Sequence, residues 1–351
     1  MRFVHLADVH LGAVPDRGCA WSARREEEIW ETFRRVIAYI RENPVDLLFI
    51  AGDLFHRQPL KKELKEVNYL FTTIPETRVF LIAGNHDYLK RDSMYRTFSW
   101  AENVYFFGSE KVQSVHLTEP EVTVYGFSFC HREIREDLLA GCVPEDEEGL
   151  HILLAHGGDQ DHVPMNVRSL SAAGFDYIAL GHIHRPGMLI RNRAAFSGAL
   201  EPIDRNDTGA HGFIEGYTDA DGRLKIRFIP FAQRNYEEIS VTLTENATQG
   251  WLEEEIRSRI EERGQQHIYR VLLDGVRPPD MVLIPERIRL LGNISEFADL
   301  SRFAYDLPLL EKQYSGTLIG DYIRYFRNSE MGEVEEKALM YGLQALLETS
   351  R

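Results

Sequence analysis

The chain has 351 residues, of which 44% are hydrophobic and 27% charged, so it can bury a large core and is neither disordered nor fibrous. Its 40 Lys and Arg are outnumbered by 55 Asp and Glu, which gives a formal net charge of −15. This charge excludes binding of a polyanion through overall charge, and it leaves only local or metal-assisted contacts with phosphate groups.

The cysteines and the N-terminus narrow the class of protein further. Cys19, Cys130 and Cys142 are far apart, odd in number and outside any CxxC motif, which indicates neither a disulfide framework nor a thiolate zinc site. The first residues, MRFVHLADVH, lack a cationic start followed by a long apolar run, and no segment reaches the roughly 18 uninterrupted apolar residues of a membrane span. We therefore expect a soluble, cytoplasmic protein with no membrane partner.

The first hundred residues alternate between strand and helix patterns. A strand-like run at 2–7 precedes a stretch at 22–43 whose apolar residues recur at helical spacing behind Ser22, a possible helix cap. Strand-like VDLLFIA (45–51), a second helical pattern at 60–74 and strand-like VFLIA (79–83) follow. The order βαβαβ predicts a parallel sheet, with the first helix covering one of its faces.

Short strands dominate from residue 103 to about 230. The strand-like runs are VYFF, VTVYGFSF, LHILLA, FDYIAL, HGFIEGY and RLKIRFI, and one helix-like stretch, EIREDLLA, covers 133–140. Two sheets packed face to face and flanked by helices satisfy this pattern. We place the domain boundary near PFAQRNYEEI, which gives domains at 1–234 and 235–351 with net charges of −7 and −8.

The second domain shows fewer sequence patterns that indicate structure or function. EISVTL, the helix-like WLEEEIRSRIEER, the strand IYRVLLDG and LIPERIRLL indicate a small α+β module. A last helical stretch at 333–348 has an apolar stripe that either packs on its own domain or docks a partner. The stripe consists of Val334, Ala338, Leu339, Leu346 and Leu347.

Five apolar runs of the first domain end in polar residues of the types that bind metals. FVHLA ends in Asp8-Val-His10, LLFIA in Gly52-Asp53, VFLIA in Gly84-Asn85-His86-Asp87, HILLA in His156-Gly157, and DYIAL in Gly181-His182-Ile183-His184. Open α/β sheets bind ligands just outside the carboxyl ends of their strands, so these five tips predict one binding site.

The residue types at these tips predict metal ions. Carboxylate, imidazole and amide groups without a thiolate suit a divalent ion such as Mn, Fe or Zn. Side chains two apart on an extended segment point the same way, so Asp8 with His10, and His182 with His184, can each aim at one centre. Seven candidate ligands exceed the needs of one ion, which predicts two metals that share a carboxylate. Each motif alone has a plainer explanation as a surface or core histidine or a turn, and only their recurrence on five strands favours a metal site.

The series DVH, GD, GNHD, HG and GHIH resembles the calcineurin-like metallophosphoesterase superfamily over nearly all of residues 1–230. Within it, LADVHLG, GDLFHR and LGHIHRPG are similar to the SbcD/YhaO-type bacterial DNA repair exonucleases, and SGALEPIDRNDTGAHGF and EEKALMYGLQALL are similar to their YhaO branch. The resemblance implies an α/β fold, with a four-layer αββα sandwich metallophosphoesterase domain followed by a small C-terminal α+β capping domain.

The resemblance also implies a ligand set for two divalent metal ions, Mn²⁺ in the first place and Fe²⁺, Zn²⁺ or Mg²⁺ as alternatives. One ion would be held by Asp8, His10, Asp53 and His184, and the other by Asp53, Asn85, His156 and His182. Such a pair of ions binds a phosphate oxygen and supplies hydroxide at neutral pH. His86 is then available for proton transfer, and Asp87 either orients its ring or is a turn-forming or helix-capping acid.

His56, three residues after Asp53, corresponds to a histidine that positions DNA ends in the related nucleases, although it also fits the start of a solvated helix. Basic residues near the motifs either contact phosphates or are scattered surface charge: Arg57, Lys61, Lys62, Lys90, Arg91, Arg185, Arg191 and Arg193. In the family, the capping domain contacts DNA and docks a coiled-coil ATPase subunit of the SbcC/YhaN type, and the phosphoesterase domain forms a homodimer.

Three functions agree with these features. The first is a Mn-dependent exonuclease, 3′ to 5′ on DNA ends, which His56 and the nearby basic residues favour. The second is a small-substrate metallophosphatase or cyclic-nucleotide phosphodiesterase, which suits the acidic charge. The third is a non-catalytic DNA-end-binding subunit, which is disfavoured because no ligand is missing from the motifs.

Overall fold

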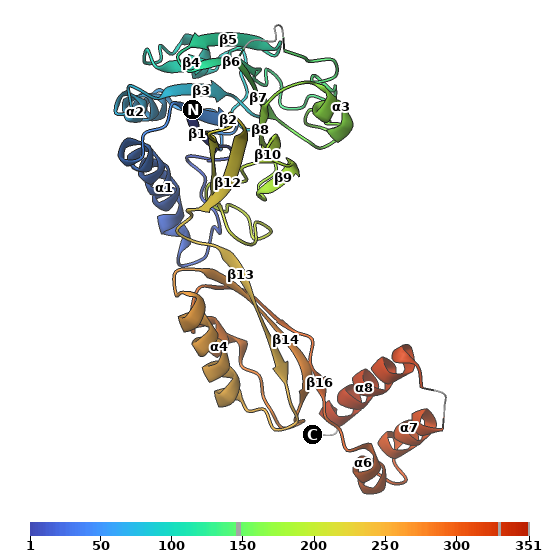
Figure 1. Cartoon of the computed structure of the whole chain (residues 1–351). Coiled ribbons are helices and arrows are strands. Elements are labelled where there is room, and N and C mark those ends of the chain that lie inside the picture. The colour runs from blue at the N-terminus through green and yellow to red at the C-terminus, as the bar shows by residue number, and fades with distance from the viewer. Residues whose placement is uncertain (145–148, 329–330, 350–351) are drawn as a thin grey trace. The chain divides into compact units, whose positions relative to one another are not determined.

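The computed structural model describes residues 1–144, 149–328 and 331–349, which form two compact units, Met1–Tyr236 and Glu237–Arg351 (Figure 1). The division falls two residues after the boundary placed at 234 from the sequence. None of the helices in the described ranges combines the length and the apolar character that a membrane crossing needs.

The first sheet of the N-terminal unit has the strand order β12-β11-β1-β2-β3-β4. Strands β1 to β4 are parallel, as the βαβαβ pattern predicts, while β11 returns antiparallel beside β1 and β12 pairs with β11 at the edge. The strands are β1 (Arg2–Leu6), β2 (Leu47–Ala51), β3 (Arg78–Ile82), β4 (Val104–Phe106), β11 (Gly212–Thr218) and β12 (Leu224–Pro230).

The second sheet has the order β5-β6-β7-β8-β10-β9. Its four central strands are parallel and its two edge strands, β5 and β9, are antiparallel to their neighbours. The strands are β5 (Gln113–Thr118), β6 (Glu121–Gly126), β7 (Leu150–His156), β8 (Tyr177–Gly181), β9 (Gly187–Ile190) and β10 (Ala194–Phe196). The sequence patterns did not indicate β5, β9 or β10.

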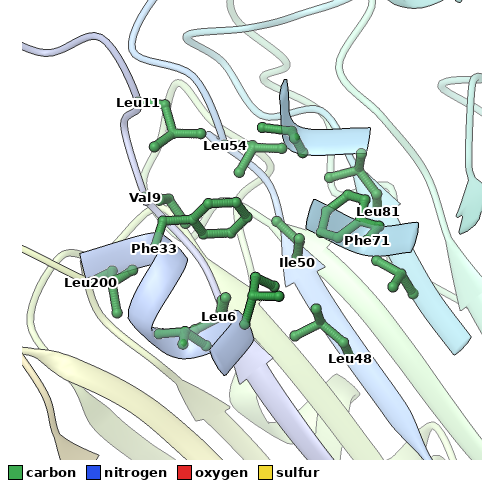
Figure 2. Close-up of a cluster of buried hydrophobic side chains, with 14 of the residues drawn as sticks. Leu6, Val9, Leu11, Phe33, Leu48, Ile50, Leu54, Phe71, Leu81 and Leu200 are labelled. Atoms are coloured by element: carbon green, nitrogen blue, oxygen red, sulfur yellow. The ribbon is translucent and has the colours of Figure 1, made fainter. Parts of the chain in front are cut away.

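The two sheets pack face to face, and helices and loops cover their two outer faces. Phe49 and Phe80 of the first sheet lie in one buried cluster with Tyr177 of the second. Helices α1 (Ser22–Glu42) and α2 (Lys61–Thr72) cover the outer face of the first sheet, where Phe33 and Phe71 pack among the leucines and isoleucines of the strands (Figure 2). The short helix α3 (Val167–Ala172) and loops cover the second sheet. This is the predicted αββα sandwich.

Two local predictions were wrong. The Ser22 hydroxyl donates to the carbonyl of Pro15 at 2.6 Å instead of capping α1, whose N-cap position is Trp21. Residues 133–140 contain no helix in the structure, because the backbone of Ile134 bonds to the 161–163 segment at both its N–H and its carbonyl. A helix over 133–140 would have used the carbonyl of Ile134 internally, for the N–H four residues later.

The C-terminal unit combines a small sheet with a group of helices. Strands β13 (Tyr236–Leu243), β14 (Ile268–Arg277) and β15 (Ile294–Asp299) form the sheet, and β16 (Arg302–Phe303) pairs with β14. The other elements are α4 (Gln249–Arg263), α5 (Pro285–Arg289), α6 (Leu307–Gln313), α7 (Leu318–Arg327) and α8 (Glu333–Glu348).

The predicted apolar stripe of α8 is only partly covered. Leu339 is buried, and Leu346 and Leu347 pack against the core of α7 within the same unit. Val334, at the start of the stripe, is 74% exposed. The stripe therefore packs on its own domain along its second half only.

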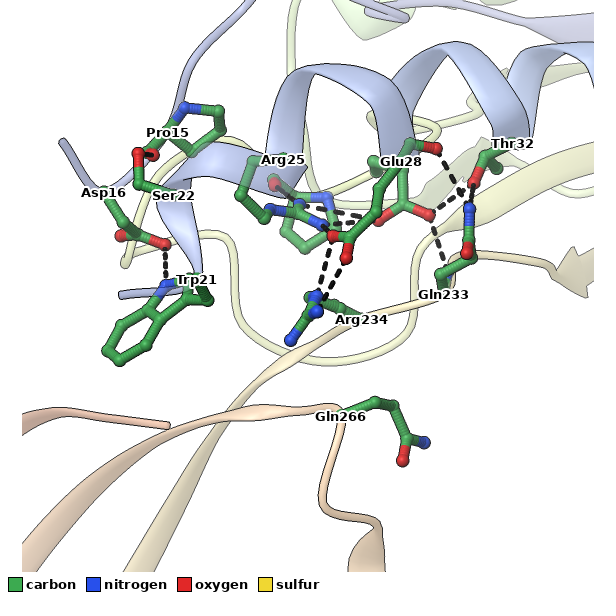
Figure 3. A network of polar contacts seen from close by, with 12 residues as sticks. Pro15, Asp16, Trp21, Ser22, Arg25, Glu28, Thr32, Gln233, Arg234 and Gln266 are labelled. Atoms are coloured by element: carbon green, nitrogen blue, oxygen red, sulfur yellow. Dashed lines mark hydrogen bonds and ion pairs between the residues drawn. The ribbon is translucent and has the colours of Figure 1, made fainter. Parts of the chain in front are cut away.

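A buried ion pair joins α1 to the segment after β10 (Figure 3). The side chains of Arg25 and Glu201 are both fully buried, with Nη1 of Arg25 3.4 Å from Oε2 of Glu201. Glu201 also accepts the hydroxyl of Thr32 at 2.7 Å and the N–H of Gln233 at 2.6 Å. Neighbouring Leu200 donates its N–H to the carbonyl of Asp8, so this network anchors the chain beside the predicted metal site.

We expect Arg25→Ala to lower the free energy of unfolding of the metal-free protein by about 3–5 kcal/mol, because it leaves Glu201 buried without its counter-charge. Urea unfolding followed by circular dichroism measures this change. Arg24→Ala, which removes an exposed arginine from the same helix, is the matched control and should change stability by less than about 0.5 kcal/mol. Equal effects of the two substitutions would contradict the prediction.

Candidate metal centre

The first group of predicted ligands converges beyond the carboxyl ends of β1 and β8. Asp8, His10 and His184 present donor atoms within 4.8 Å of one another. Nε2 of His10 lies 3.1 Å from Nε2 of His184. The Asp8 carboxylate also accepts the backbone N–H of His182 at 2.9 Å, which ties the two strand ends together.

The second group lies beside the first and contains Asp53, Asn85, His156 and His182. Oδ1 of Asn85 is 2.9 Å from Nε2 of His156 and 3.2 Å from Nδ1 of His182. Oδ2 of Asp53 is 3.4 Å from Nε2 of His156 and 3.9 Å from Nε2 of His10. Asp53 thus stands between the two groups, where a bridging ligand would stand.

The seven side chains fit two divalent cations. Their facing atoms are carboxylate oxygens, an amide oxygen and imidazole nitrogens, which are the donors that Mn²⁺, Fe²⁺ and Zn²⁺ accept in open, catalytic sites. Several of these atoms face one another at 2.9 to 3.2 Å, and a cation between them would bind carboxylate, amide and neutral imidazole groups together.

The backbone reaches this arrangement through strained conformations, and this corrects one prediction. Asp8 and His10 have φ angles of 50° and 52°, so they do not lie on an extended segment, and β1 ends at Leu6. Asp53 and His182 also have positive φ, at 51° and 93°. Such conformations cost on the order of 1–3 kcal/mol per residue and persist where the surrounding structure over-determines them, typically at functional sites.

Gly84 allows the closest approach of the backbone to the site. A Cβ atom there would lie 2.2 Å from Oδ1 of Asp53, so a larger residue would displace the carboxylate. The glycine of GNHD is therefore required by packing against Asp53.

Burial and mutual charge shift the pKa values of the cluster in opposite directions. Burial raises the pKa of Asp8 to about 6, although His156 and His184 oppose the shift. Burial also acts against the charged form of Asp53, but His156 and His10 lower its pKa well below the usual range. Despite their own burial, His156 and His184 have pKa values raised to about 9, His156 by Asp53 and His184 by a hydrogen bond to Asp207.

His86 is oriented by the backbone and not by Asp87. Its Nδ1 lies 3.1 Å from the carbonyl oxygen of His56, and its own N–H donates to Oδ1 of Asp53 at 2.9 Å. With Nδ1–H engaged, Nε2 is the ring nitrogen left for a substrate.

Asp87 is fully buried and braces the turn. Its carboxylate accepts the N–H groups of Phe55 and Gly84 and the hydroxyl of Tyr95, at 2.8 to 3.1 Å, and burial raises its pKa to about 7. These contacts join the ends of β2 and β3. The expectation that Asp87 orients the His86 ring is replaced by this structural role.

His56 lies beside the first group of ligands. It is half-buried, and its donor atoms lie within 4.8 Å of those of His10 and His86. Its Nδ1 is 3.4 Å from Nδ1 of His10. His56 is therefore part of the cluster and not merely the first residue of a solvated helix.

The predicted basic residues differ in how freely they are exposed. Arg57 forms a two-point ion pair with Glu63, at 2.8 and 3.1 Å, and Lys90 lies 3.4 Å from Asp92. The guanidinium of Arg193 donates to the carbonyl of Phe175. Among the predicted basic residues, those that are exposed and have no ion pair with an acidic residue in the described ranges are Lys61, Lys62, Arg91, Arg185 and Arg191.

Two acidic residues that the sequence reasoning did not single out contact the predicted ligands. Oδ2 of Asp207 is 3.0 Å from Nδ1 of His184, and Oδ2 of Asp159 is 2.7 Å from Nε2 of His182. Both lie in polar segments after motif residues, where Asp is also a common turn former, so their type and position carried no distinct signal.

The fold and this arrangement of ligands are those of a metal-dependent phosphoesterase. The chain belongs to the calcineurin-like phosphoesterase family, whose model matches residues 1–186. It is similar to YhaO, an uncharacterized metallophosphoesterase of Bacillus subtilis, with 27% identity over 88% of this chain and 81% of the relative. It is also similar to the DNA double-strand break repair protein Mre11 of Methanopyrus kandleri, with 29% identity over 76% of this chain and 63% of the relative. The corresponding values for Mre11 of Methanocaldococcus jannaschii are 28%, 59% and 58%.

The predicted family is thereby confirmed. The prediction that the chain is a metal-dependent hydrolase of phosphate esters, related to nucleases, is confirmed as well. The family uses a dinuclear metal centre, and the clusters of Asp and His in this chain agree with it.

Metal binding should release protons. Below pH 9 the metal-free protein holds protons on His156 and His184, because both pKa values are raised to about 9, and a metal ion binds only the neutral rings. We expect uptake of the full metal complement at pH 7.5 to release about two protons, and the apparent affinity to fall as the pH is lowered from 9. Titration calorimetry of Mn²⁺ in buffers of different ionisation enthalpy measures the proton count. A count near zero would contradict the assignment of these two rings.

Proposed function

We propose that the chain is a dinuclear-metal-dependent exonuclease that hydrolyses phosphodiester bonds at DNA ends, in the 3′ to 5′ direction, in DNA repair. The observation that carries this proposal is the position of His56, whose ring lies against His10 and His86. A phosphatase that acts on a small ester needs no third imidazole there, whereas a polymer end needs a group outside the metal pair to fix it. The similarity to Mre11 proteins, whose name states a role in DNA double-strand break repair, supports the proposal.

The proposed ligands follow the two groups described above. Asp8, His10, Asp53 and His184 would hold one ion, and Asp53, Asn85, His156 and His182 would hold the other, with Mn²⁺ as the favoured metal. The two ions would supply Lewis acidity toward the phosphate and toward a water molecule.

The residues beside the metal ligands transfer protons, position the substrate or support the GNHD turn. Nε2 of His86 stabilises the charge that develops on the phosphate or protonates the departing sugar oxygen, because Nδ1 is engaged by the His56 carbonyl. The ring of His56 holds the terminal nucleotide. Asp87 keeps the GNHD turn in place without touching the substrate.

The acidic chain contacts DNA locally. The cations Lys61, Lys62, Arg91 and Arg185 follow the motif residues in sequence and are exposed, so they can pair with phosphates while the metal ions offset the negative charge of the site. Arg57 and Lys90 reach DNA only if they leave Glu63 and Asp92.

We also propose two protein partners. A coiled-coil ATPase subunit of the SbcC/YhaN type would bind the C-terminal helices, which expose large apolar side chains on α7 and α8: Leu318, Tyr325, Val334 and Tyr341 are each about 70% exposed. A second copy of the chain would bind through the phosphoesterase domain to form a homodimer.

A small-substrate metallophosphatase or cyclic-nucleotide phosphodiesterase is the second candidate. The net charge of −15 favours it, because small esters need no extended basic surface. The same residues would hold the metal ions in either enzyme.

The purified protein should release nucleotides from the ends of labelled duplex DNA in the presence of Mn²⁺, and Asp53→Asn should abolish both the activity and metal binding because it removes the shared ligand. A parallel assay with an aryl phosphate monoester and an aryl diester separates the two candidates. Turnover of the small esters with intact DNA, also in the presence of the ATPase partner, would favour the phosphatase or phosphodiesterase.

Substitution of His86 and of His56 distinguishes a residue that takes part in phosphodiester hydrolysis from one that positions the DNA end. We expect His86→Ala to keep the metal ions and lose turnover of DNA and aryl diester alike by a factor on the order of 100 or more. His56→Ala should lose DNA-end hydrolysis while keeping most of the aryl diester activity. His131, an exposed histidine paired with Glu110 on the same unit, provides the control substitution. Equal loss of both activities in His56→Ala would show that His56 does not act on the polymer end.

A further inference from the structure

We infer that Asp207 and Asp159 are positioning residues, each of which holds one histidine of the GHIH motif with a chosen ring nitrogen toward its own metal ion. The inference rests on the dinuclear centre proposed above and does not depend on the substrate. It assigns a separate supporting carboxylate to each of the two ions.

Asp207 supports His184. Its carboxylate oxygens lie 3.0 and 3.2 Å from Nδ1 of His184, while Nε2 of the same ring faces Nε2 of His10. A neutral imidazole has one N–H and one lone pair. When Asp207 accepts the Nδ1–H, the lone pair is on Nε2 and points into the first group of ligands.

Asp159 supports His182 in the opposite sense. Its Oδ2 lies 2.7 Å from Nε2 of His182, while Nδ1 of that ring lies 3.2 Å from Oδ1 of Asn85 in the second group. The lone pair of His182 is therefore on Nδ1. Two histidines separated by one residue thus offer different ring nitrogens, and the carboxylate behind each ring decides which.

The two carboxylates differ in how far they are exposed to water. The side chain of Asp207 is 10% exposed, and its Oδ2 also accepts the N–H groups of Ile203 and Asp204. Nε2 of the buried His211 lies 3.1 Å from the carbonyl oxygen of Asp207 and braces the loop from behind. Asp159 is held as well, because its Oδ1 accepts the N–H groups of Asp161 and His162 and lies 2.9 Å from Nδ1 of His162. Its side chain is 47% exposed, however, so water competes for its bond to His182.

Site-selective weakening of metal binding tests the inference. Loss of a carboxylate behind a metal-binding histidine reduces metal affinity by about 10- to 100-fold. We expect Asp207→Asn to weaken the same binding step as His184→Ala, and Asp159→Asn the same step as His182→Ala. The loss should be larger for the buried Asp207. Calorimetric titration of the metal-free protein with Mn²⁺, together with electron paramagnetic resonance of bound Mn²⁺, resolves the two steps without any measurement of activity.

Matched controls come from the same loops. Asp204→Asn and Asp161→Asn remove exposed carboxylates that do not contact a predicted ligand, and both should leave the two binding steps within about twofold of the unsubstituted protein. Thermal unfolding of each metal-free variant verifies the fold.

Unchanged Mn²⁺ binding in Asp207→Asn and Asp159→Asn, or equal weakening of both steps by either substitution in a folded protein, would overturn the positioning roles while leaving the dinuclear centre intact. Failure of the unsubstituted protein to bind two Mn²⁺ ions would instead overturn the proposed centre, and the inference with it.

Discussion

Buried negative charge at one edge of two stacked sheets is the constraint on which the rest of the site depends. Asp8, Asp53 and Asp87 are almost completely removed from water within a few residues of the strand ends. Burial raises the pKa of Asp8 to about 6 and of Asp87 to about 7, while Asp53 stays ionised because two histidines face it. Such a concentration of carboxylates requires positive charge, which protons on His156 and His184 provide in the metal-free protein and divalent cations provide in the active enzyme.

The packing of the sandwich makes this charge distribution possible. Strained backbone at Asp8, His10 and Asp53 turns the side chains inward, and the chain beside Asp8 is anchored by the buried pair of Arg25 and Glu201. Asp87 uses its own carboxylate to join the ends of β2 and β3. The predicted metal ligands are thus held by hydrogen bonds from the surrounding fold, and groups held in this way need little reorganisation during catalysis.

Around the ligands, the remaining groups fall into two sets with different tasks. His56 and His86 lie against His10 on the side of the first group, and the contact of Nδ1 of His86 with the His56 carbonyl leaves its Nε2 for the proton transfer that we propose. Asp207 and Asp159 lie behind His184 and His182 and direct those rings inward. The acidic composition of the chain is consistent with the proposed function, in which the cations that meet the phosphate would be the metal ions and a few exposed basic residues near the motifs.

The sequence by itself determined the architecture of the first unit and the residues that gather at its strand ends. The periodicity of the apolar residues predicted α1, α2 and the parallel strands, because long amphipathic helices and buried strands follow local patterns. The recurrence of ligand-type residues after five strands predicted one site, because parallel strands bring their carboxyl ends to the same edge. Short or irregular elements such as β9, β10 and α3 were missed, and the helix expected at 133–140 does not form, since tertiary hydrogen bonds override weak local patterns.

Only the tertiary structure decided how each side chain is used. The left-handed backbone at Asp8 and His10, the bracing role of Asp87 and the choice of ring nitrogen at His182 and His184 all depend on contacts between segments far apart in the chain. A local pattern specifies residue type and approximate position. The conformation and hydrogen-bond partner of a buried polar group are set by whatever the packed fold places next to it.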